Sequence, residues 1–514
     1  MLRRVTFLKD NHTVEVEEGT TVQEAQIAAG RIPDAVCGGK GICGKCKVRI
    51  NGKEVPACRT RIYEDLLVEE FTVEMEETAV GVEMPADVEH PTAAAIESSM
   101  DSSTAPDLRE FSAEKPEGTT GFYAAVDVGT TTLAAYLLDA ASGEVIETGS
   151  MLNPQRKYGA DVVERCNHSF TEGKAALSSV IRKAVNQLLE MLTARRQASV
   201  TEIQRLVMVG NTGMHHLFLE LPTEQLALAP YLPYTKAAVR MPAYECGIRI
   251  APEAEVLWLP NLGGFVGADT SACILASGIY EAEEMTLLVD IGTNGEMVLG
   301  NSQSGLLACA VAAGPAFEGA KISCGMRGIT GAIDRVFIKE NSYDQEISYH
   351  VIGDKKPVGI CGSGLLDAAA CLRQKGLIDE TGRMEETYYF SEGVYLCQQD
   401  IRELQLAKAA VAAGIQILCR QKGITVEQID RVLLAGAFGN YMNSESACDI
   451  GMLPGALRDR IRPIGNAAGE GAVMAARDLQ EFEKIKRIAE NVEYLELSTN
   501  KEFPYSYIEA MDFA

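Results

Sequence analysis

Apolar and polar residues alternate in two short segments near the N-terminus, on either side of Asp10-Asn-His12. Alternation of this kind around a turn is typical of a β-hairpin. Asn51-Gly52 separates two further segments and suits a type I′ turn, because both central residues of that turn need positive φ. We therefore predict a small β-rich unit in residues 1–73. Its predicted elements are strands at 5–9, 13–16, 46–50 and 54–58 and a helix at 22–29 that Thr20 or Thr21 caps.

From residue 121 onward, apolar runs of strand length alternate with helical patterns, which indicates an α/β architecture. Two of these runs resemble each other: Ala125-Val-Asp-Val-Gly-Thr-Thr-Thr132 and Leu288-Val-Asp-Ile-Gly-Thr-Asn-Gly295. Their aspartates, Asp127 and Asp290, are 163 positions apart (290 − 127). Solenoids repeat about every 20 to 50 residues. The longer interval predicts instead two related lobes that face each other.

Between these two parts the composition changes. Residues 74–118 contain twelve acidic and two basic residues, several prolines and a serine-rich stretch at 98–103. This composition predicts a flexible, self-repelling linker, and an irregular subdomain is the alternative. The predicted organisation is therefore a unit at 1–73, an acidic linker at 74–120 and a two-lobed unit at 121–514.

The whole chain has 514 residues, 46% of them hydrophobic, and a formal net charge of −25. Nucleic-acid binding needs basic clusters, and the sequence shows none. An uninterrupted apolar run of about 18 residues, as a membrane helix needs, is also missing. The first ten residues lack the apolar core of a signal peptide. We expect a cytoplasmic protein without nucleic-acid or membrane partners.

Four of the fourteen cysteines are close together in a glycine-rich segment. Their spacing, Cys-x5-Cys-x2-Cys-x11-Cys, resembles the plant-type [2Fe–2S] pattern, with one extra residue in the first gap. A structural zinc site normally has two Cys-x2–4-Cys pairs, whereas only one such pair is present here. The spacing favours a [2Fe–2S] cluster, and zinc is the alternative. The predicted ligands are Cys37, Cys43, Cys46 and Cys58.

Each repeated run is an apolar strand that ends in aspartate and leads into a Gly-Thr turn. Aspartate at a strand end can hold Mg²⁺ through its water shell or position an attacking water, and the turn offers N–H and O–H donors to phosphate. A third glycine turn follows the strand that begins at Arg431, and no P-loop motif occurs. We therefore predict a polyphosphate site between the lobes. Its candidate residues are Asp127, Gly129, Thr130, Thr131, Thr132, Asp290, Gly292, Thr293, Asn294, Gly295, Gly436 and Gly439.

These three turns, in this order, resemble the phosphate-1, phosphate-2 and adenosine motifs of the ASKHA superfamily, which includes acetate and sugar kinases, Hsp70 and actin. The resemblance implies a two-lobed α/β fold with ATP in the cleft. It implies crossing helices at 267–280 and from 361, with Asp269 either a third carboxylate or a helix-terminal acid. Gly362-Ser-Gly-Leu-Leu-Asp367 has only a partial dinucleotide fingerprint, so we interpret it as a helix start.

The whole chain resembles the ATP-dependent reductive activators of corrinoid enzymes, in which a ferredoxin-like β-grasp domain precedes an ASKHA domain. The similarity includes Asn153-Pro-Gln155, Gly210-Asn-Thr-Gly-Met-His-His216 and Ile322-Ser-Cys-Gly-Met-Arg327. It implies return of an inactive Co(II) corrinoid of a methyltransferase system to Co(I), an external low-potential electron donor, and a homodimer. Longer members carry a separate middle domain, and here only the acidic stretch lies in its place.

ATP has a physical reason to take part. The Co(II)/Co(I) couple lies below the roughly −400 mV of a ferredoxin-type cluster, and each 59 mV of deficit costs about 1.4 kcal/mol for one electron. Ser323 and Arg327 are candidates to approach the cobalt and the corrinoid protein, with a structural turn as the alternative. A small-molecule kinase with a redox-sensing domain and a nucleotide-gated, Hsp70-like scaffold are the competing functions.

Overall fold

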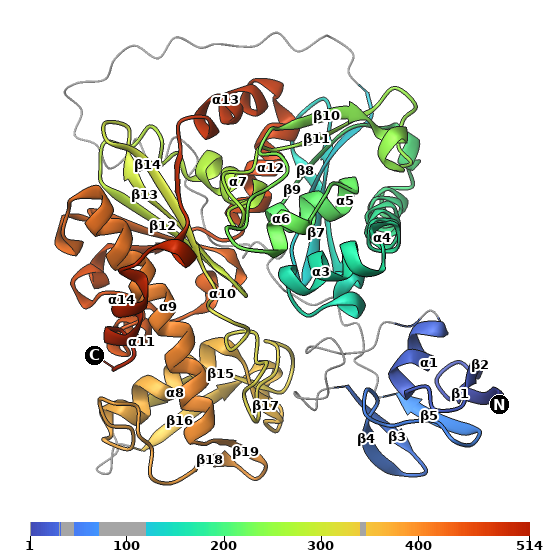
Figure 1. Cartoon of the computed structure of the whole chain (residues 1–514), viewed down its shortest axis with the longest axis horizontal. Coiled ribbons are helices and arrows are strands. Elements are labelled where there is room, and N and C mark those ends of the chain that lie inside the picture. The colour runs from blue at the N-terminus through green and yellow to red at the C-terminus, as the bar shows by residue number, and fades with distance from the viewer. Residues whose placement is uncertain (1, 30, 32–45, 71–119, 340–345, 514) are drawn as a thin grey trace.

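The computed structural model describes residues 2–29, 31, 46–70, 120–339 and 346–513. Within them, the N-terminal unit is a five-stranded sheet with strand order β2-β1-β5-β3-β4, accompanied by the helix α1 (Figure 1). The predicted linker lies outside the described residues except for Thr120. The elements of this unit are β1 (Leu2–Phe7), β2 (His12–Glu17), α1 (Val22–Ala28), β3 (Lys47–Ile50), β4 (Lys53–Pro56) and β5 (Leu66–Glu70).

The local signals of this unit are confirmed. Strands β1 and β2 pair antiparallel, and β3 pairs antiparallel with β4 through a turn in which Asn51 and Gly52 have φ of 50° and 78°. Thr21 caps α1 in a capping box with Glu24. The sequence prediction lacked β5, which lies at the centre of the sheet and pairs parallel with β1. A central position of this kind depends on a distant partner strand, which local alternation cannot reveal.

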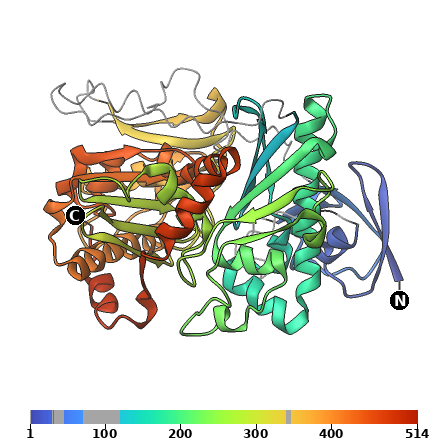
Figure 2. The ribbon, with the colours of Figure 1, turned by 90° about the horizontal axis from the view of Figure 1, so that it is seen from above.

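The remainder of the described chain contains two six-stranded sheets of matching topology. Their strand orders are β10-β11-β9-β6-β7-β8 and β21-β20-β12-β13-β14-β22. In each sheet an antiparallel three-strand meander carries a parallel strand beside its first member: β9 beside β6, and β20 beside β12. The two lobes lie side by side (Figure 2). The prediction of two related lobes is confirmed by this repeated topology.

In the first lobe, helices from two parts of the chain cover the two faces of the sheet. Its apolar core includes Leu133, Val207 and Trp258, all fully buried. Its strands are β6 (Phe122–Val128), β7 (Thr132–Asp139), β8 (Val145–Leu152), β9 (Ile203–Gly210), β10 (Val239–Pro242) and β11 (Glu255–Trp258). Its helices are α3 (Val162–Glu172), α4 (Lys174–Arg195), α5 (Thr212–Leu219), α6 (Glu224–Ala227), α7 (Ala268–Ser277), α12 (Ala467–Arg477) and α13 (Leu479–Ala489).

The second lobe has its own apolar core and two additional small sheets. Its main sheet comprises β12 (Thr286–Ile291), β13 (Gly295–Asn301), β14 (Gly305–Val311), β20 (Arg431–Ala435), β21 (Ile461–Pro463) and β22 (Glu493–Leu495). The small sheets comprise β15 (Ala332–Ile338), β16 (Ile347–Val351) and β17 (Gly359–Ile360), and β18 (Tyr388–Ser391) and β19 (Val394–Leu396). Its helices are α8 (Gly362–Gln374), α9 (Gln398–Lys422), α10 (Gly436–Tyr441), α11 (Ser444–Asp449) and α14 (Phe503–Glu509).

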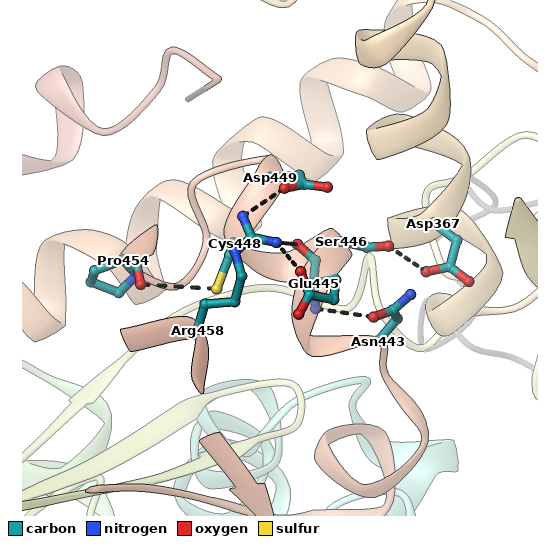
Figure 3. Close-up of polar contacts among 8 residues, drawn as sticks. All are labelled: Asp367, Asn443, Glu445, Ser446, Cys448, Asp449, Pro454 and Arg458. Carbon is teal, nitrogen blue, oxygen red and sulfur yellow. Dashed lines mark hydrogen bonds and ion pairs between the residues drawn. The ribbon is translucent and has the colours of Figure 1, made fainter. Parts of the chain in front are cut away.

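A buried polar contact joins α8 to α11 in this lobe. The Ser446 hydroxyl donates to Asp367 at 2.7 Å, and burial raises the pKa of that carboxyl (Figure 3). Arg458 forms ion pairs with Glu445 and with Asp449. Asp367 therefore has a structural role here, and the interpretation of Gly362 as a helix start is confirmed.

Helices α7 and α12 lie between the two main sheets (Figure 1). Helix α7 confirms the first predicted crossing helix. The prediction that the second crossing helix begins at Cys361 is wrong, because α8 packs on β15 inside the second lobe, whereas α12 packs on α7. At Gly471 the two helices approach so closely that a β-carbon would overlap the carbonyl oxygen of Ala272.

In the described part of the chain, no helix is both long and apolar enough to cross a membrane.

This close approach predicts the effect of a larger residue at Gly471. We expect Gly471→Val to lower the free energy of unfolding by about 2–3 kcal/mol, because overpacking forces the two helices apart. Urea unfolding followed by the fluorescence of Trp258, the single tryptophan, measures this. Gly455→Ala is the control, since no atom lies within 4 Å of a β-carbon there, and we expect a change within about 0.5 kcal/mol. Equal stability of the two variants would contradict the interpretation.

Candidate functional site

Two of the four predicted cluster ligands lie in the described residues, and they converge. Cys46 directly precedes β3, Cys58 follows β4, and the Sγ atoms are 3.1 Å apart. This separation is too long for a disulfide bond, and Cys46 is buried in the small core. Cys37 and Cys43 lie outside the described residues. Paired thiols that converge without a disulfide suit iron ligation by thiolates, so the residues present fit a [2Fe–2S] cluster.

The two predicted phosphate loops follow corresponding strands of the two lobes but are held by different hydrogen bonds. The first follows β6, where Asn153 Nδ2 donates to the carbonyl of Gly129 at 2.9 Å and Asn211 Nδ2 donates to the Thr130 hydroxyl at 2.8 Å. The second follows β12, where the Gly292 N–H donates to the carbonyl of Asn294 at 2.7 Å. The first loop is therefore held by side-chain amides from two distant segments of the chain, and the second by a hydrogen bond within its own turn.

Asn153 and Asn211 stand in two motifs that carried the family resemblance, but the sequence analysis gave them no role. In the structure they cap the neighbouring helical turns and support the first phosphate loop at the same time. A side-chain amide can do both because it has an acceptor oxygen and two N–H donors.

The predicted carboxylates meet between the lobes. Asp127 ends β6, Asp290 ends β12, and Asp269 lies in the first turn of α7. Burial and the charges of Asp269 and Asp290 raise the pKa of Asp127 to about 8. Burial raises the pKa of Asp269 to about 7, with the charge of Asp290 adding to it. Burial raises the pKa of Asp290 to about 6. These side chains are close enough to repel one another.

A cation would relieve this repulsion, and the geometry limits how it can bind. Among the described residues, no three His, Cys, Asp or Glu side chains lie close enough together to ligate one metal ion directly. Mg²⁺ typically keeps several waters and uses few carboxylates. The residues present therefore fit a Mg²⁺ ion that is held through its water shell rather than in a closed protein cage.

Asn466 is a further member of this cluster that the sequence analysis missed. Its side chain hydrogen-bonds to Asp127, donates to the Tyr136 hydroxyl at 2.9 Å and caps α12. The N-termini of both crossing helices are therefore at the carboxylates, where the helix dipole favours negative charge. Asp269 combines its two predicted roles, being an acid in a first helical turn and a member of the carboxylate cluster.

The third glycine turn lies beside the same cluster. Gly436 has φ of +81°, and a β-carbon there would overlap Oδ1 of Asp290. The residue must therefore be glycine for β20 and β12 to end so close together. Gly439, in α10, faces Leu434 of the preceding strand β20, and its contact with a nucleoside stays a prediction. The ring of Phe438 stacks on Phe317 with centroids 4.5 Å apart.

Ser323 and Arg327 lie in a loop that follows β14 and a tight turn at 314–319. The side chain of Ser323 is exposed, and its N–H donates to Asp400 at 2.6 Å. Asp400 is fully buried in the first turn of α9. The loop is therefore anchored through its backbone, which leaves the serine hydroxyl at the surface. The sequence analysis missed Asp400 because it is 77 positions away from Ser323.

Glu318 is the residue whose position is least expected from the sequence. Its carboxylate accepts hydrogen bonds from Thr131 at 3.0 Å and from Thr293. These threonines belong to the two phosphate loops, so one side chain connects both lobes. In the sequence, Glu318 is one acidic residue in a six-residue segment that glycines begin and end, Gly314 to Gly319. Such a segment is typical of many turns, so it does not indicate this role.

The raised pKa of Asp127 predicts how stability depends on pH. An unfolded aspartate has a pKa of about 3.9, so between about pH 4 and pH 8 the folded chain holds a proton that the unfolded chain has released. The free energy of unfolding therefore falls as pH rises through this window, by up to about 1.4 kcal/mol per pH unit. We expect Asp127→Asn to flatten the fall between about pH 6 and 8.

The measurement is urea unfolding without nucleotide or divalent cation, followed by Trp258 fluorescence. Asp459→Asn is the control, because Asp459 is exposed and should leave the pH dependence unchanged. Identical slopes for the native chain and Asp127→Asn would show that Asp127 does not hold a proton at neutral pH.

Comparison with known proteins places these features in a family. Residues 5–72 match the 2Fe-2S iron-sulfur cluster binding domain, residues 122–282 match the RACo middle region, and residues 284–514 match the C-terminal domain of RACo, the ASKHA domain. The first lobe up to α7 thus matches the middle region of the family, whereas its helices α12 and α13 fall in the C-terminal match. The expectation that the chain lacks such a region, with only the acidic stretch in its place, is wrong.

Individual relatives agree with this assignment. The chain is 32% identical to the corrinoid activation enzyme RamQ of Eubacterium limosum, over 98% of both chains. It is 25% identical to a Co(II) methylated amine-specific corrinoid protein reductase of Methanosarcina barkeri, over 75% of both. A solved reductive activator for corrinoid, iron-sulfur protein superposes with a TM-score of 0.69 at 30% identity, covering 99% of this chain and 98% of that one. The chain therefore belongs to the RACo family, the reductive activators of corrinoid proteins that join a [2Fe–2S] domain to an ASKHA domain.

Proposed function

We propose that this chain binds ATP between its two lobes and couples that binding to the one-electron reduction of a Co(II) corrinoid, held by a partner protein, to Co(I). The observation that carries the proposal is the combination of two features in one chain. Cys46 and Cys58 converge on a ferredoxin-like sheet, and two related Asp-Gly-Thr loops meet between two lobes. A small-molecule kinase with a redox-sensing domain, or a nucleotide-gated scaffold, would also use both features, but the relatives of this chain are corrinoid activators and reductases.

The cysteines define the electron-transfer end of the proposal. Cys46 and Cys58, with Cys37 and Cys43, are the proposed iron ligands. A [2Fe–2S] cluster bound there supplies single electrons at low potential. The small core around Cys46 keeps that thiol away from solvent. Each turnover consumes one electron, so the proposal includes an external low-potential donor.

The two predicted phosphate loops form the proposed nucleotide site. Hydroxyls and backbone N–H groups of both turns are the proposed phosphate donors, and the carboxylates hold Mg²⁺ through water or orient the water that attacks ATP. Gly436 and Gly439 form the proposed floor of the nucleoside site. The proposed phosphate contacts are Gly129, Thr130, Thr131, Thr132, Gly292, Thr293, Asn294 and Gly295, and the proposed carboxylates are Asp127, Asp269 and Asp290.

The exposed hydroxyl of Ser323 is the proposed contact with the corrinoid, and Arg327 is the proposed contact with the acidic surface of its protein. Asp400 supports this role because it holds the loop through the backbone. We further propose the division into 1–73, 74–120 and 121–514, a homodimer through the C-terminal part, and a cytoplasmic location, where thiolate ligands stay reduced.

The test uses the purified full chain, a reductant such as Ti(III) citrate, and a Co(II) corrinoid protein of a methyltransferase system. We expect the Co(I) absorption band to form with ATP and at least about tenfold more slowly without it, since tenfold corresponds to about 1.4 kcal/mol of coupling. Cys58→Ser should lose iron, sulfide and reduction but keep ATP binding. The matched control is Cys246→Ser, at a buried thiol that donates to a backbone carbonyl in the first lobe.

Two outcomes would contradict the proposal. One is reduction at the same rate and extent without ATP. The other is a protein isolated with stoichiometric zinc and without acid-labile sulfide, which would replace the cluster by a structural metal site.

A separate prediction concerns Ser323. Because its hydroxyl is exposed while its backbone is held by Asp400, we expect Ser323→Ala to fold normally and to retain iron and ATP binding. We expect reduction of the corrinoid to slow by about tenfold. Ser302→Ala, at another exposed serine, should reduce at the native rate. Native rates for Ser323→Ala would assign this loop to structure alone.

A further inference from the structure

The turn at 314–319 contacts both predicted phosphate loops and the helix that begins at the third glycine turn. The N–H of Gly314 donates to the carbonyl of Thr293 at 3.0 Å, Phe317 stacks on Phe438 beside the third glycine turn, and Glu318 accepts from Thr131 and Thr293. The sequence analysis assigned no function to this turn. Its position lets a ligand bound between the two predicted phosphate loops contact this turn.

The carboxylate of Glu318 uses the donors that phosphate would use. Its two oxygens each accept from one threonine hydroxyl, and the two threonines come from opposite lobes. A phosphate group clamped from both sides would need the same hydroxyls. Two anions in one place repel each other, so the carboxylate and a nucleotide phosphate exclude one another at these donors.

The surroundings already accommodate negative charge. Arg165 is fully buried, and its Nη2 has no hydrogen-bond partner in the part of the chain that the structure describes. Burial and the charge of Arg156 lower the pKa of Arg165 to about 9, while the charges of Asp161 and Glu318 oppose this. The charge of Glu318 therefore acts on a buried guanidinium that has one unpartnered nitrogen among the described residues.

The other end of the turn contacts the loop of Ser323. Gly319 and Gly325 pack backbone to backbone, and a β-carbon on Gly325 would overlap the carbonyl oxygen of Gly319. Gly325 is two residues from Ser323. Contacts this close leave no space in which one segment can move without the other, because protein interiors are close-packed.

We propose that Glu318 occupies the phosphate position when no nucleotide is bound, and that ATP displaces it and thereby repositions the Ser323 loop. Glu318 is thus a positioning residue for the reduction, and this inference rests on the proposed function. Nucleotide phosphates take over the hydroxyls of Thr131 and Thr293, the carboxylate leaves, and the turn at 314–319 moves with it. The close contact between Gly319 and Gly325 transmits the movement to Ser323.

Glu318→Gln tests the displacement. Removal of the charge weakens the internal competitor, so we expect ATP to bind about three- to tenfold more tightly than to the native chain, measured by calorimetry with a non-hydrolysable analogue. A merely structural role would leave the affinity equal or lower. Glu386→Gln, at an exposed glutamate of the same lobe, is the matched control and should bind as the native chain does.

Hydrogen–deuterium exchange of residues 314–327 tests the transmission. In the native chain we expect the analogue to raise the exchange rate at least about threefold. In Glu318→Gln the rate should already be raised without nucleotide, and the analogue should change it no further. Glu318→Asp keeps the charge but is one methylene too short to reach both hydroxyls, so it should also show the raised rate without nucleotide.

The results separate the two levels of the proposal. If the native chain binds ATP and both variants match its affinity and its exchange without nucleotide, the role of Glu318 is overturned while the proposed function stands. If the native chain does not bind ATP, the proposed function fails and this inference fails with it. Iron content, measured in every variant, verifies that the N-terminal domain is intact.

Discussion

The burial of Asp127, Asp269 and Asp290 close to one another is the electrostatic constraint that the region between the two lobes has to satisfy. Each carboxylate is brought there by a different element, and burial raises the pKa of each. The neighbouring carboxylates raise the pKa of Asp127 and Asp269 further. The fold tolerates this because Asn466 and the N-termini of α7 and α12 face the same point. A site that is unfavourable by itself is well suited to a bound cation, which relieves the repulsion directly.

The crossing helices make this arrangement rigid. Small residues line the contact between α7 and α12, and the backbones approach too closely for any side chain at Gly471. The two main sheets pack on opposite sides of this pair. Relative movement of the lobes therefore has to occur at the loops, where Thr131 and Thr293 share one carboxylate, rather than by separation of the helices.

The turn at 314–319 and the proposed corrinoid contacts Ser323 and Arg327 lie within fourteen residues of chain, 314–327. The turn at 314–319 touches both phosphate loops and Phe438, and the loop that follows it is held by Asp400. This continuity offers a physical route from the proposed nucleotide site to the loop of Ser323. The route consists of discrete hydrogen bonds and backbone contacts, and a coupling between two sites needs such a two-state element.

Local patterns determined much of what this protein is. Cysteine spacing, the Asp-Gly-Thr repeat, the Asn51-Gly52 turn and the Thr21 cap depend on neighbouring residues, and they predicted a cluster-binding unit joined to two related lobes. Tertiary structure alone decided the central position of β5, the choice of α12 over α8 as the second crossing helix, and the convergence of Asn466, Asp400 and Glu318 on the sites. These features depend on partners far away in the chain. A short sequence window does not show which distant segment a residue will contact.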